Sequence, residues 1–230
     1  MRAMILAAGR GERMRPLTDS CPKPLLRVGG KALIEWHLER LSRTGFRQIV
    51  INHAHLGSML EQALGDGSRW GLAIAWSREG EALETAGGIA QALPLLGSDP
   101  FLVVNGDIWC DFDFGRARTI AAQMLAGGLN AWCVLVDNPP QHPRGDFGID
   151  GGRLLAGASQ HFTFSGIGVY RPTLFGQVVR GQPAPLAPLL REAITRGTAG
   201  AERHAGRWVD VGTPQRLAEL DAQLRSSATE

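Results

Sequence analysis

The chain has 230 residues, of which 44% are hydrophobic, and its 24 Lys and Arg against 22 Asp and Glu give a net charge of +2. We expect one α/β domain over residues 1–230, because the hydrophobic content suffices for a core and no low-complexity linker divides the chain. The near-zero net charge argues against the broad basic surface of a nucleic-acid-binding protein, so we expect no nucleic-acid partner.

Three cysteines, Cys21, Cys110 and Cys133, are widely spaced and form no C-x-x-C pair. Such a set is typical of reduced thiols rather than of a disulfide framework or a zinc site. The N-terminus enters an apolar strand without a charged leader, and no apolar run approaches the ~20 residues of a membrane span. We therefore expect a soluble, cytoplasmic protein with no signal peptide and no membrane partner.

Strand and helix patterns alternate through the first half of the chain. Short apolar runs predict strands, and apolar residues at helical spacing predict helices. The expected strands are 4–7, 47–52, 72–76, 101–105 and 130–136, and the expected helices are 31–43, 55–64 and 87–93. This alternation implies right-handed crossovers and a Rossmann-like, doubly wound, mostly parallel sheet with helices on both faces.

The second half of the chain is less regular. Asp150-Gly151-Gly152 is a hairpin turn signal within 147–155. A last helix is expected from residue 214, with Thr213 as its N-cap. Further strands are expected at 162–170 and 207–211, and a further helix at 187–196.

A glycine-rich, cationic loop follows the first expected strand. It has the pattern Leu-x-x-Gly-x-Gly-x-Arg-x-x-Pro-Leu-Thr over 6–18, and Pro-Lys-Pro-Leu-Leu follows at 22–26. Glycines let backbone N–H groups approach an anion and the cations neutralise it, so the loop suits a polyphosphate. Two better-known phosphate loops are excluded, because Met14 stands where a dinucleotide fingerprint needs glycine and Gly30-Lys31 lacks the following Ser or Thr of a P-loop.

Two aspartates lie at the ends of apolar strands. Asp107 follows the expected strand 101–105, and Asp210 lies near the end of 207–211, before a glycine. In open α/β sheets, ligands bind beyond the carboxyl ends of the strands. Carboxylate oxygens suit Mg²⁺, which keeps water and phosphate oxygens as its other ligands. Asp107 and Asp210 are therefore the expected ligands of Mg²⁺, with Mn²⁺ as the alternative cation.

The ordered motifs near the N-terminus resemble the signature of the sugar-1-phosphate nucleotidyltransferases, which have a GT-A-like fold. The resemblance implies that a phosphate oxygen of a sugar 1-phosphate attacks the α-phosphorus of a nucleoside triphosphate in line, and that pyrophosphate leaves. A phosphate monoester has a second pKa of about 6 and is already ionised near neutral pH, so the reaction needs no general base. It needs cations, a metal and alignment.

The resemblance also assigns roles to individual residues. Arg13 and Lys23 are the expected catalytic residues: Arg13 would contact β- and γ-phosphate oxygens, and Lys23, held between two prolines, would bridge the phosphates of both substrates. Asp107 and Asp210 match the two positions that hold Mg²⁺ in the family. The expected nucleotide-binding residues are Ala8, Gly9, Gly11, Glu12, Arg13, Lys23, Glu79, Ala86, Gly87 and Gly88, and the expected substrate-binding residues on the sugar side are Asn105, Gly145, Ser165 and Gly166.

Residues 79–89 resemble the segment that cups the nucleobase in this family. Its small residues at 86–88 would let backbone groups reach the base, and Glu79 or Glu81 would accept a hydrogen bond from a base N–H. Related enzymes usually have Gly-Thr where this chain has Glu-Thr at 84–85. The identity of the base therefore stays open at this point.

Within the family, the chain most resembles the bacterial N-acetylmuramate 1-phosphate uridylyltransferases of peptidoglycan recycling, which use UTP. The resemblance rests on the compact length, on Glu-Thr-Ala-Gly-Gly-Ile at 84–89 and on Phe-Ser-Gly-Ile at 164–167. Family members often carry a C-terminal left-handed β-helix, for which the stretch after residue 211 is too short. The oligomeric state stays open between a monomer and a small homo-oligomer.

Three alternatives to this interpretation remain. Mannose-1-phosphate guanylyltransferases share nearly all of the same motifs. A regulatory subunit that binds a nucleotide sugar without catalysis would keep the fold, although Arg13, Lys23, Asp107 and Asp210 are all present. A dehydrogenase is disfavoured by Met14 and by the basic loop.

Overall fold

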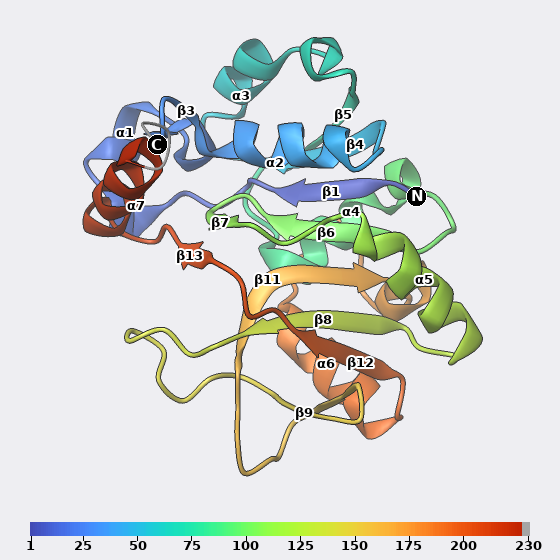
Figure 1. The fold of residues 1–230 in the computed structure, drawn as a ribbon. Coiled ribbons are helices and arrows are strands. Elements are labelled where there is room, and N and C mark those ends of the chain that lie inside the picture. The colour runs from blue at the N-terminus through green and yellow to red at the C-terminus, as the bar shows by residue number, and fades with distance from the viewer. Residues whose placement is uncertain (227–230) are drawn as a thin grey trace.

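Nine strands form one central sheet in the order β5-β4-β1-β6-β11-β8-β12-β10-β9 (Figure 1), in a computed structural model that describes residues 1–226. Seven of the strands run in one direction, and only β11 and β10 run in the other. This confirms the predicted parallel-dominated sheet, with an antiparallel β11 inserted near its middle. The strands of this sheet are β1 (Ala3–Leu6), β4 (Gln48–His53), β5 (Ala73–Arg78), β6 (Phe101–Asn105), β8 (Ala131–Val136), β9 (Gly148–Asp150), β10 (Arg153–Leu155), β11 (Thr163–Tyr170) and β12 (Ala199–Arg203).

Helices cover both faces of the sheet, as the doubly wound pattern predicts (Figure 1). Met4 and Ile5 are neighbours on β1 and point to opposite faces, so each belongs to a different apolar layer. The layer around Ile5 includes α2 (Leu33–Arg43), α3 (Gly57–Leu64) and α5 (Arg116–Ala126). The layer around Met4 includes α4 (Glu84–Leu96) and α6 (Leu186–Thr195). Burial on both faces explains why β1 is wholly apolar.

The C-terminal segment returns to the loops at one end of the sheet. Antiparallel pairs join β13 (Trp208–Asp210) to β7 (Ile108–Cys110) and β2 (Arg27–Val28) to β3 (Lys31–Ala32). The turn between β2 and β3 is Gly29-Gly30, and both glycines have a positive φ, as a tight hairpin requires. Helix α7 (Pro214–Ser226) packs on β2, and Asp221 accepts a hydrogen bond of 2.7 Å from the Gly29 backbone N–H.

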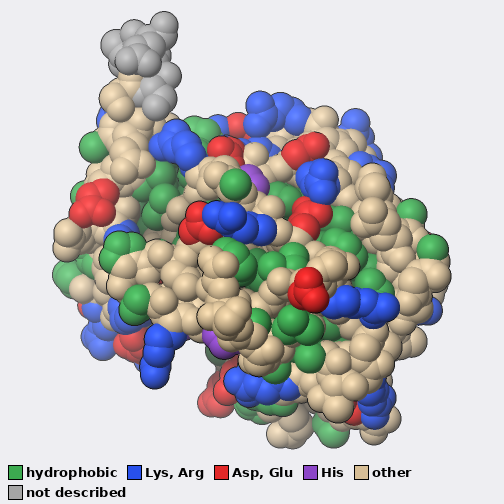
Figure 2. All heavy atoms as spheres, turned by 60° about the horizontal axis from the view of Figure 1, so that its bottom comes forward, with side chains coloured by type: hydrophobic (Ala, Val, Ile, Leu, Met, Phe, Trp, Pro, Cys, Tyr) green, Lys and Arg blue, Asp and Glu red, His purple; other side chains and the backbone are tan. Residues whose placement is uncertain are grey.

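Several short helical turns complete the fold: α1 (Leu17–Ser20) and the 3₁₀ turns η1 (Glu12–Met14), η2 (Lys23–Leu25), η3 (Ser68–Trp70) and η4 (Pro172–Phe175). No helix within residues 1–226 is both long and apolar enough to cross a membrane. No left-handed β-helix occurs in the same range. On the face that Figure 2 shows, basic and acidic side chains are interspersed, in keeping with the net charge of +2.

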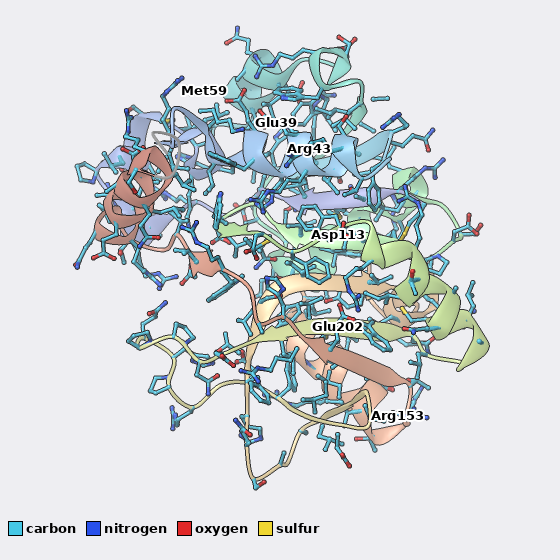
Figure 3. The ribbon with its side chains drawn as sticks, in the orientation of Figure 1. Glu39, Arg43, Met59, Asp113, Arg153 and Glu202 are labelled. Carbon is cyan, nitrogen blue, oxygen red and sulfur yellow. The ribbon has the colours of Figure 1, made fainter. Side chains whose placement is uncertain are left out.

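Most of the expected elements are present, and their bounds differ by a few residues. The expected helix at 31–43 begins at Leu33, because residues 31–32 form β3. Its polar side carries Glu39 and Arg43, opposite the buried residues (Figure 3). The hairpin predicted at 150–152 is confirmed by the β9–β10 pair, and the backbone N–H of Arg216 donates to Thr213 Oγ1, which confirms the predicted N-cap. The elements β7, α5, β12 and the β2–β3 hairpin were not predicted.

Candidate active site

The carboxyl ends of β1, β4 and β6 meet at one edge of the sheet. Leu6 at the end of β1 is in register with Asn52 on β4 and with Asn105 on β6. The segments that follow these strands therefore lie side by side, where open α/β sheets bind ligands. A cavity of about 370 Å³ opens there. Its lining includes Ala7, Ala8, Gly9, Gly11, Glu12, Arg13, Lys23, Asn52, Ala82, Glu84, Thr85, Asn105, Asp107 and Gly212.

The glycine-rich loop forms one wall of this cavity. At Gly9, a Cβ would meet no atom within 4 Å, so the backbone is exposed to whatever occupies the cavity. Gly11 has a φ of +70°, and a Cβ there would lie 3.0 Å from Thr18 Cγ2. Thr18 Oγ1 and the Met14 backbone N–H both donate to Gly11 O, at 2.9 and 2.8 Å. These contacts fix the loop, so its glycines present backbone to a ligand at little steric cost.

Lys23 lies beneath this loop and faces the cavity. Its side chain is 8% exposed, and its Nζ lies 2.8 Å from Asp107 Oδ2. Pro22 and Pro24 stiffen the 3₁₀ turn that begins at Lys23. A buried ammonium needs an anionic partner, and Asp107, which is 39% exposed, supplies one here. The structure therefore places the Lys23 ammonium beside the carboxylate of Asp107 at the cavity.

Backbone pairing brings the second aspartate to the same place. In the β7–β13 pair, Asp210 is in register with Ile108, and the Val211 backbone N–H donates to Asp107 O at 2.9 Å. Asp107 directly precedes β7 and Asp210 ends β13, so the pairing of these two strands brings the two aspartates to neighbouring positions. Their carboxylate oxygens are ligands of the kind that Mg²⁺ prefers. Within residues 1–226, no group of three or more His, Cys, Asp or Glu side chains could hold a metal, so a cation at these two aspartates would take further ligands from phosphate and water.

Beneath β7, His37 of α2 supports this arrangement. His37 is buried, and its Nε2 lies 2.9 Å from Ile108 O. Burial lowers the pKa of His37 from 6.5 to about 4, so the ring is neutral at physiological pH. The carbonyl can only accept, so Nε2 carries the proton of the neutral ring. This contact anchors the residue directly after Asp107.

A second cavity, of about 290 Å³, adjoins the first. Arg13, Asn105 and Asp107 line both cavities. The other residues that line it are Ile108, Pro139, Gln141, His142, Thr163, Phe164, Ser165, Gly166, Trp208 and Asp210. Two ligands placed in these cavities would therefore meet at Asp107, with Arg13 beside both.

A bulge in β11 shapes the floor of the second cavity. The register shifts between Phe164 and Ile167, where Gly166 has a φ of +78°. A Cβ on Gly166 would lie 2.6 Å from Asn105 Nδ2, so only glycine leaves room for the Asn105 side chain. Ser165 Oγ donates to Val134 O at 2.7 Å and accepts from the Ile167 N–H, which holds the bulge in place. The structure thus brings together Asn105, Ser165 and Gly166.

The loop over this cavity presents residues other than the predicted Gly145. Gly145 has a φ of +63° and does not line either cavity. Its backbone N–H donates to His142 O at 3.2 Å, and Gln141 and His142 line the cavity instead. His142 Nε2 lies 3.0 Å from Asp146 Oδ1, and Asp146 Oδ2 accepts from the Phe164 N–H at 2.8 Å. The loop is therefore tied to β11.

Glu79 is buried and is occupied by internal hydrogen bonds. Its Oε1 accepts from Asn52 Nδ2 at 2.7 Å, and its Oε2 accepts from the Leu83 N–H at 3.0 Å. Asn52 Oδ1 in turn accepts from the Ala7 N–H at 2.9 Å. This chain of bonds links the end of β1 to the segment before α4. Glu79 does not line either cavity, so its observed contacts position the wall rather than reach into it.

The predicted small residues at the start of α4 face the protein interior. The backbone N–H groups of Ala86 and Gly87 donate to Ala184 O. A Cβ on Gly87 would lie 2.4 Å from Gln182 O, and one on Gly88 would lie 2.8 Å from Asn52 Nδ2. None of these three residues lines the cavity, because α4 packs closely there. In this structure their small size accommodates close packing against residues 182–184 and Asn52.

The cavity wall was expected to be formed by residues 86–88. In the structure it is formed by Ala82, Glu84 and Thr85. Glu84 has a φ of +56°, a left-handed conformation that glycine adopts without strain. Here a carboxylate-bearing side chain stands at the wall instead.

Asn52, Gln141, His142 and Arg216 were not predicted from the sequence. Arg216 Nη1 lies 2.6 Å from Asp210 Oδ2. For Asn52 the sequence offered a signal, because a polar Asn at the end of the apolar run 49–51 lies near the carboxyl end of a buried strand, where ligands bind. The others lie in a loop and on a helix whose approach to the site depends on tertiary structure.

Comparisons with known proteins agree with this geometry. A family model described as nucleotidyl transferase matches residues 2–150. The chain is 54% identical over 226 residues to an N-acetylmuramate alpha-1-phosphate uridylyltransferase of Neisseria meningitidis serogroup B, covering 96% of this chain and 97% of that protein. It is 32% identical to a protein of the same name from Caulobacter vibrioides, covering 96% of each chain.

The fold has solved relatives as well. A putative glucose-1-phosphate thymidylyltransferase from Bacillus anthracis superposes with a TM-score of 0.83 at 20% identity, over 98% of this chain and 96% of that one. At that identity the likeness concerns the fold alone. The family match and the full-length relatives go further, and they establish that the chain belongs to the nucleotidyl transferase family.

Proposed function

We propose that the chain transfers a uridylyl group from UTP to N-acetylmuramate 1-phosphate, giving UDP-N-acetylmuramate and pyrophosphate. The reaction would serve peptidoglycan recycling in the cytoplasm and would be carried out by a single catalytic domain. Two relatives that match along their whole length carry the name of this activity. The observation that carries the proposal is the meeting of two cavities at Asp107, with Lys23 Nζ 2.8 Å from its carboxylate.

The first cavity suits the nucleoside triphosphate. Backbone at Gly9 and Gly11 borders it, and Arg13 and Lys23 bring two positive charges to its phosphate end. The second cavity suits the sugar, because Asn105 and His142 offer hydrogen-bonding groups and Trp208 offers an apolar face. A sugar phosphate placed there would reach the triphosphate at the shared border of the cavities.

The residues at this border fit a divalent cation. Asp107 and Asp210 would hold Mg²⁺, or Mn²⁺ in its place. The bound ion would supply positive charge for the phosphate oxygens at the reacting centre. Lys23 and Arg13 neutralise the two approaching anions and hold them in line, and the ionised sugar phosphate needs no base. Asn105 lies between the two cavities and is placed to orient the sugar side.

Pyrophosphate release with purified protein tests the proposal. UTP and GTP would each be paired with N-acetylmuramate 1-phosphate, N-acetylglucosamine 1-phosphate and mannose 1-phosphate. We expect kcat/KM to be highest for UTP with N-acetylmuramate 1-phosphate. A preference for GTP with mannose 1-phosphate would favour a guanylyltransferase. Binding of UTP and Mg²⁺ with no turnover for any pair would favour a regulatory subunit.

A further inference from the structure

Arg216 forms an ion pair with Asp210, one of the two carboxylates at which a divalent cation is expected. Arg216 lies in the first turn of α7, and its Nη1 is 2.6 Å from Asp210 Oδ2. The two side chains are 16% and 25% exposed. The backbone N and the Nε of Arg216 both lie 3.3 Å from Thr213 Oγ1, which orients the guanidinium. The pair is partly shielded from water, so its attraction exceeds that of a surface ion pair.

The other carboxylate is occupied in the same way, because Lys23 Nζ lies 2.8 Å from Asp107 Oδ2. Arg13 adds a third positive charge at the border of the cavities. Three positively charged side chains, Lys23, Arg13 and Arg216, thus lie near the two carboxylates in this structure. A divalent cation that approaches Asp107 and Asp210 meets carboxylates that are already paired, and it is repelled by their partners. Tight binding of the cation therefore requires these partners to move to another anion.

The structure offers such an anion a place next to Arg216. A Cβ on Gly212 would lie 2.4 Å from Arg216 Nη2, 3.0 Å from Asp210 Oδ1 and 3.1 Å from Arg13 Nη2, so both guanidinium groups and the Asp210 carboxylate border a residue without a side chain. Arg13 lines the second cavity. Arg216 lines a smaller hollow of about 160 Å³, which shares Gln141, Trp208 and Asp210 with that cavity and so adjoins it. A dianionic phosphate at this junction would attract both guanidinium groups.

We propose that Arg216 competes with the divalent cation for Asp210, and that the phosphate of the sugar 1-phosphate draws Arg216 off that carboxylate. The cation and the sugar phosphate then bind cooperatively, each favouring the other. Arg216 is a positioning residue in this account, because it acts through Asp210. The inference rests on the proposed function, which names the sugar phosphate as a substrate.

Two other roles for Arg216 predict different results. If Arg216 only orients Asp210 for the cation, its loss would weaken cation binding. If Arg216 recognises the carboxylate of an acidic sugar, its loss would impair N-acetylmuramate 1-phosphate and spare N-acetylglucosamine 1-phosphate. The short distance from Arg216 to Asp210 favours a role at the phosphate, because Asp210 is in register with Ile108, the residue directly after Asp107, and the two cavities meet at Asp107.

Binding of Mn²⁺, followed by electron paramagnetic resonance in the absence of nucleotide, separates these roles. For wild-type protein, we expect N-acetylmuramate 1-phosphate to tighten Mn²⁺ binding at least about fivefold. For Arg216→Gln, we expect Mn²⁺ alone to bind at least about fivefold more tightly than to wild type, and the further effect of the sugar phosphate to be lost. Arg225→Gln is the matched control, because Arg225 pairs with Asp221 on the same helix and lines none of the three hollows.

Steady-state kinetics give a second readout. In Arg216→Gln, the KM for the sugar phosphate should rise about tenfold for both N-acetyl sugars, in line with one lost charged contact, while the KM for UTP stays unchanged. Weaker or unchanged Mn²⁺ binding by Arg216→Gln, or a rise in KM for the acidic sugar alone, would overturn the proposal. Should the variant unfold, wild-type protein still decides, because equal Mn²⁺ affinity with and without sugar phosphate also overturns it. Failure of the proposed function is distinct, since it appears as absent pyrophosphate release by wild type.

Discussion

Replacement of Lys23 by methionine tests how much the ammonium group between the two proposed substrates contributes to catalysis. Lys23→Met keeps an unbranched apolar stem and removes the ammonium group 2.8 Å from Asp107. Loss of one preorganised donor at a reacting centre typically lowers kcat by 10²–10³, or about 3–4 kcal/mol. Lys23 is 8% exposed and would contact both substrates, so we expect a loss of about 10³ in kcat/KM.

Stability should change little in the same variant. Asp107 is 39% exposed, so water replaces the lost ammonium and the cost should stay near or below about 1 kcal/mol. For a chain of this length, that corresponds to a fall in Tm of at most about 4 °C. Pyrophosphate release and thermal unfolding measure the two quantities on one sample.

Lys31→Met is the control for this prediction. Lys31 pairs with Glu39, lies 3.8 Å over the Trp36 ring and lines none of the three hollows. We expect its kcat/KM to stay close to the wild-type value. Activity of Lys23→Met within tenfold of wild type would contradict a catalytic role of the ammonium group, as would a loss of activity accompanied by a large fall in Tm.

Three further predictions concern the cation, pH and the glycine loop. Activity should disappear on treatment with EDTA and return with Mg²⁺ or Mn²⁺, and full activity in EDTA would contradict the two-aspartate site. The free energy of unfolding should fall by about 3 kcal/mol as pH drops from 6.5 to 4, because unfolded His37 takes up a proton that the folded state excludes. Denaturant titrations would show this fall, and His37→Gln should lessen it by the share due to His37, leaving the part that comes from carboxyl groups with a lowered pKa such as Glu61; an unchanged fall in His37→Gln would refute the assignment. Gly11→Ala should cost about 1–3 kcal/mol, since its φ of +70° strains alanine. An unchanged Tm would contradict this cost.

The parts of the fold that follow from local pattern were predictable from the sequence. The strand at 101–105 is confirmed to the residue, because its apolar run is short and bounded by polar residues. The turn at Gly151-Gly152 is confirmed for a similar reason, since both glycines have a positive φ. Strand β12 was not predicted, because Ala199–Arg203 contains small and charged residues that gain strand structure only by pairing with β8.

The site residues that lie in local motifs were also predictable, and those whose position depends on packing were not. The phosphate loop, Lys23 and the two aspartates carry their chemistry in local motifs, and the structure brings them to one place. The small residues at 86–88 suggested that backbone groups there are accessible to a ligand. Whether a glycine faces a ligand or a neighbouring backbone depends on how α4 packs, which a sequence alone does not contain.

The contact of Arg216 with Asp210 is the clearest example of a feature that the sequence alone does not predict. Its position three residues after the N-cap Thr213 suggests an exposed residue of a helix. The turn between the end of β13 and the start of α7, together with the packing of α7 on β2, brings Arg216 to Asp210. Long side chains that cross from one element to another are set by tertiary geometry, and single-sequence patterns do not encode their partners.

The position of a bound Mn²⁺ ion shows whether Asp107 and Asp210 hold one metal at the nucleotide. Crystals grown with UTP and Mn²⁺ would be measured for anomalous scattering from the metal. We expect an anomalous peak at about 2.1 Å from a carboxylate oxygen of both Asp107 and Asp210, in contact with phosphate oxygens of the nucleotide. A metal bound to the triphosphate but beyond coordination distance of both aspartates would contradict it.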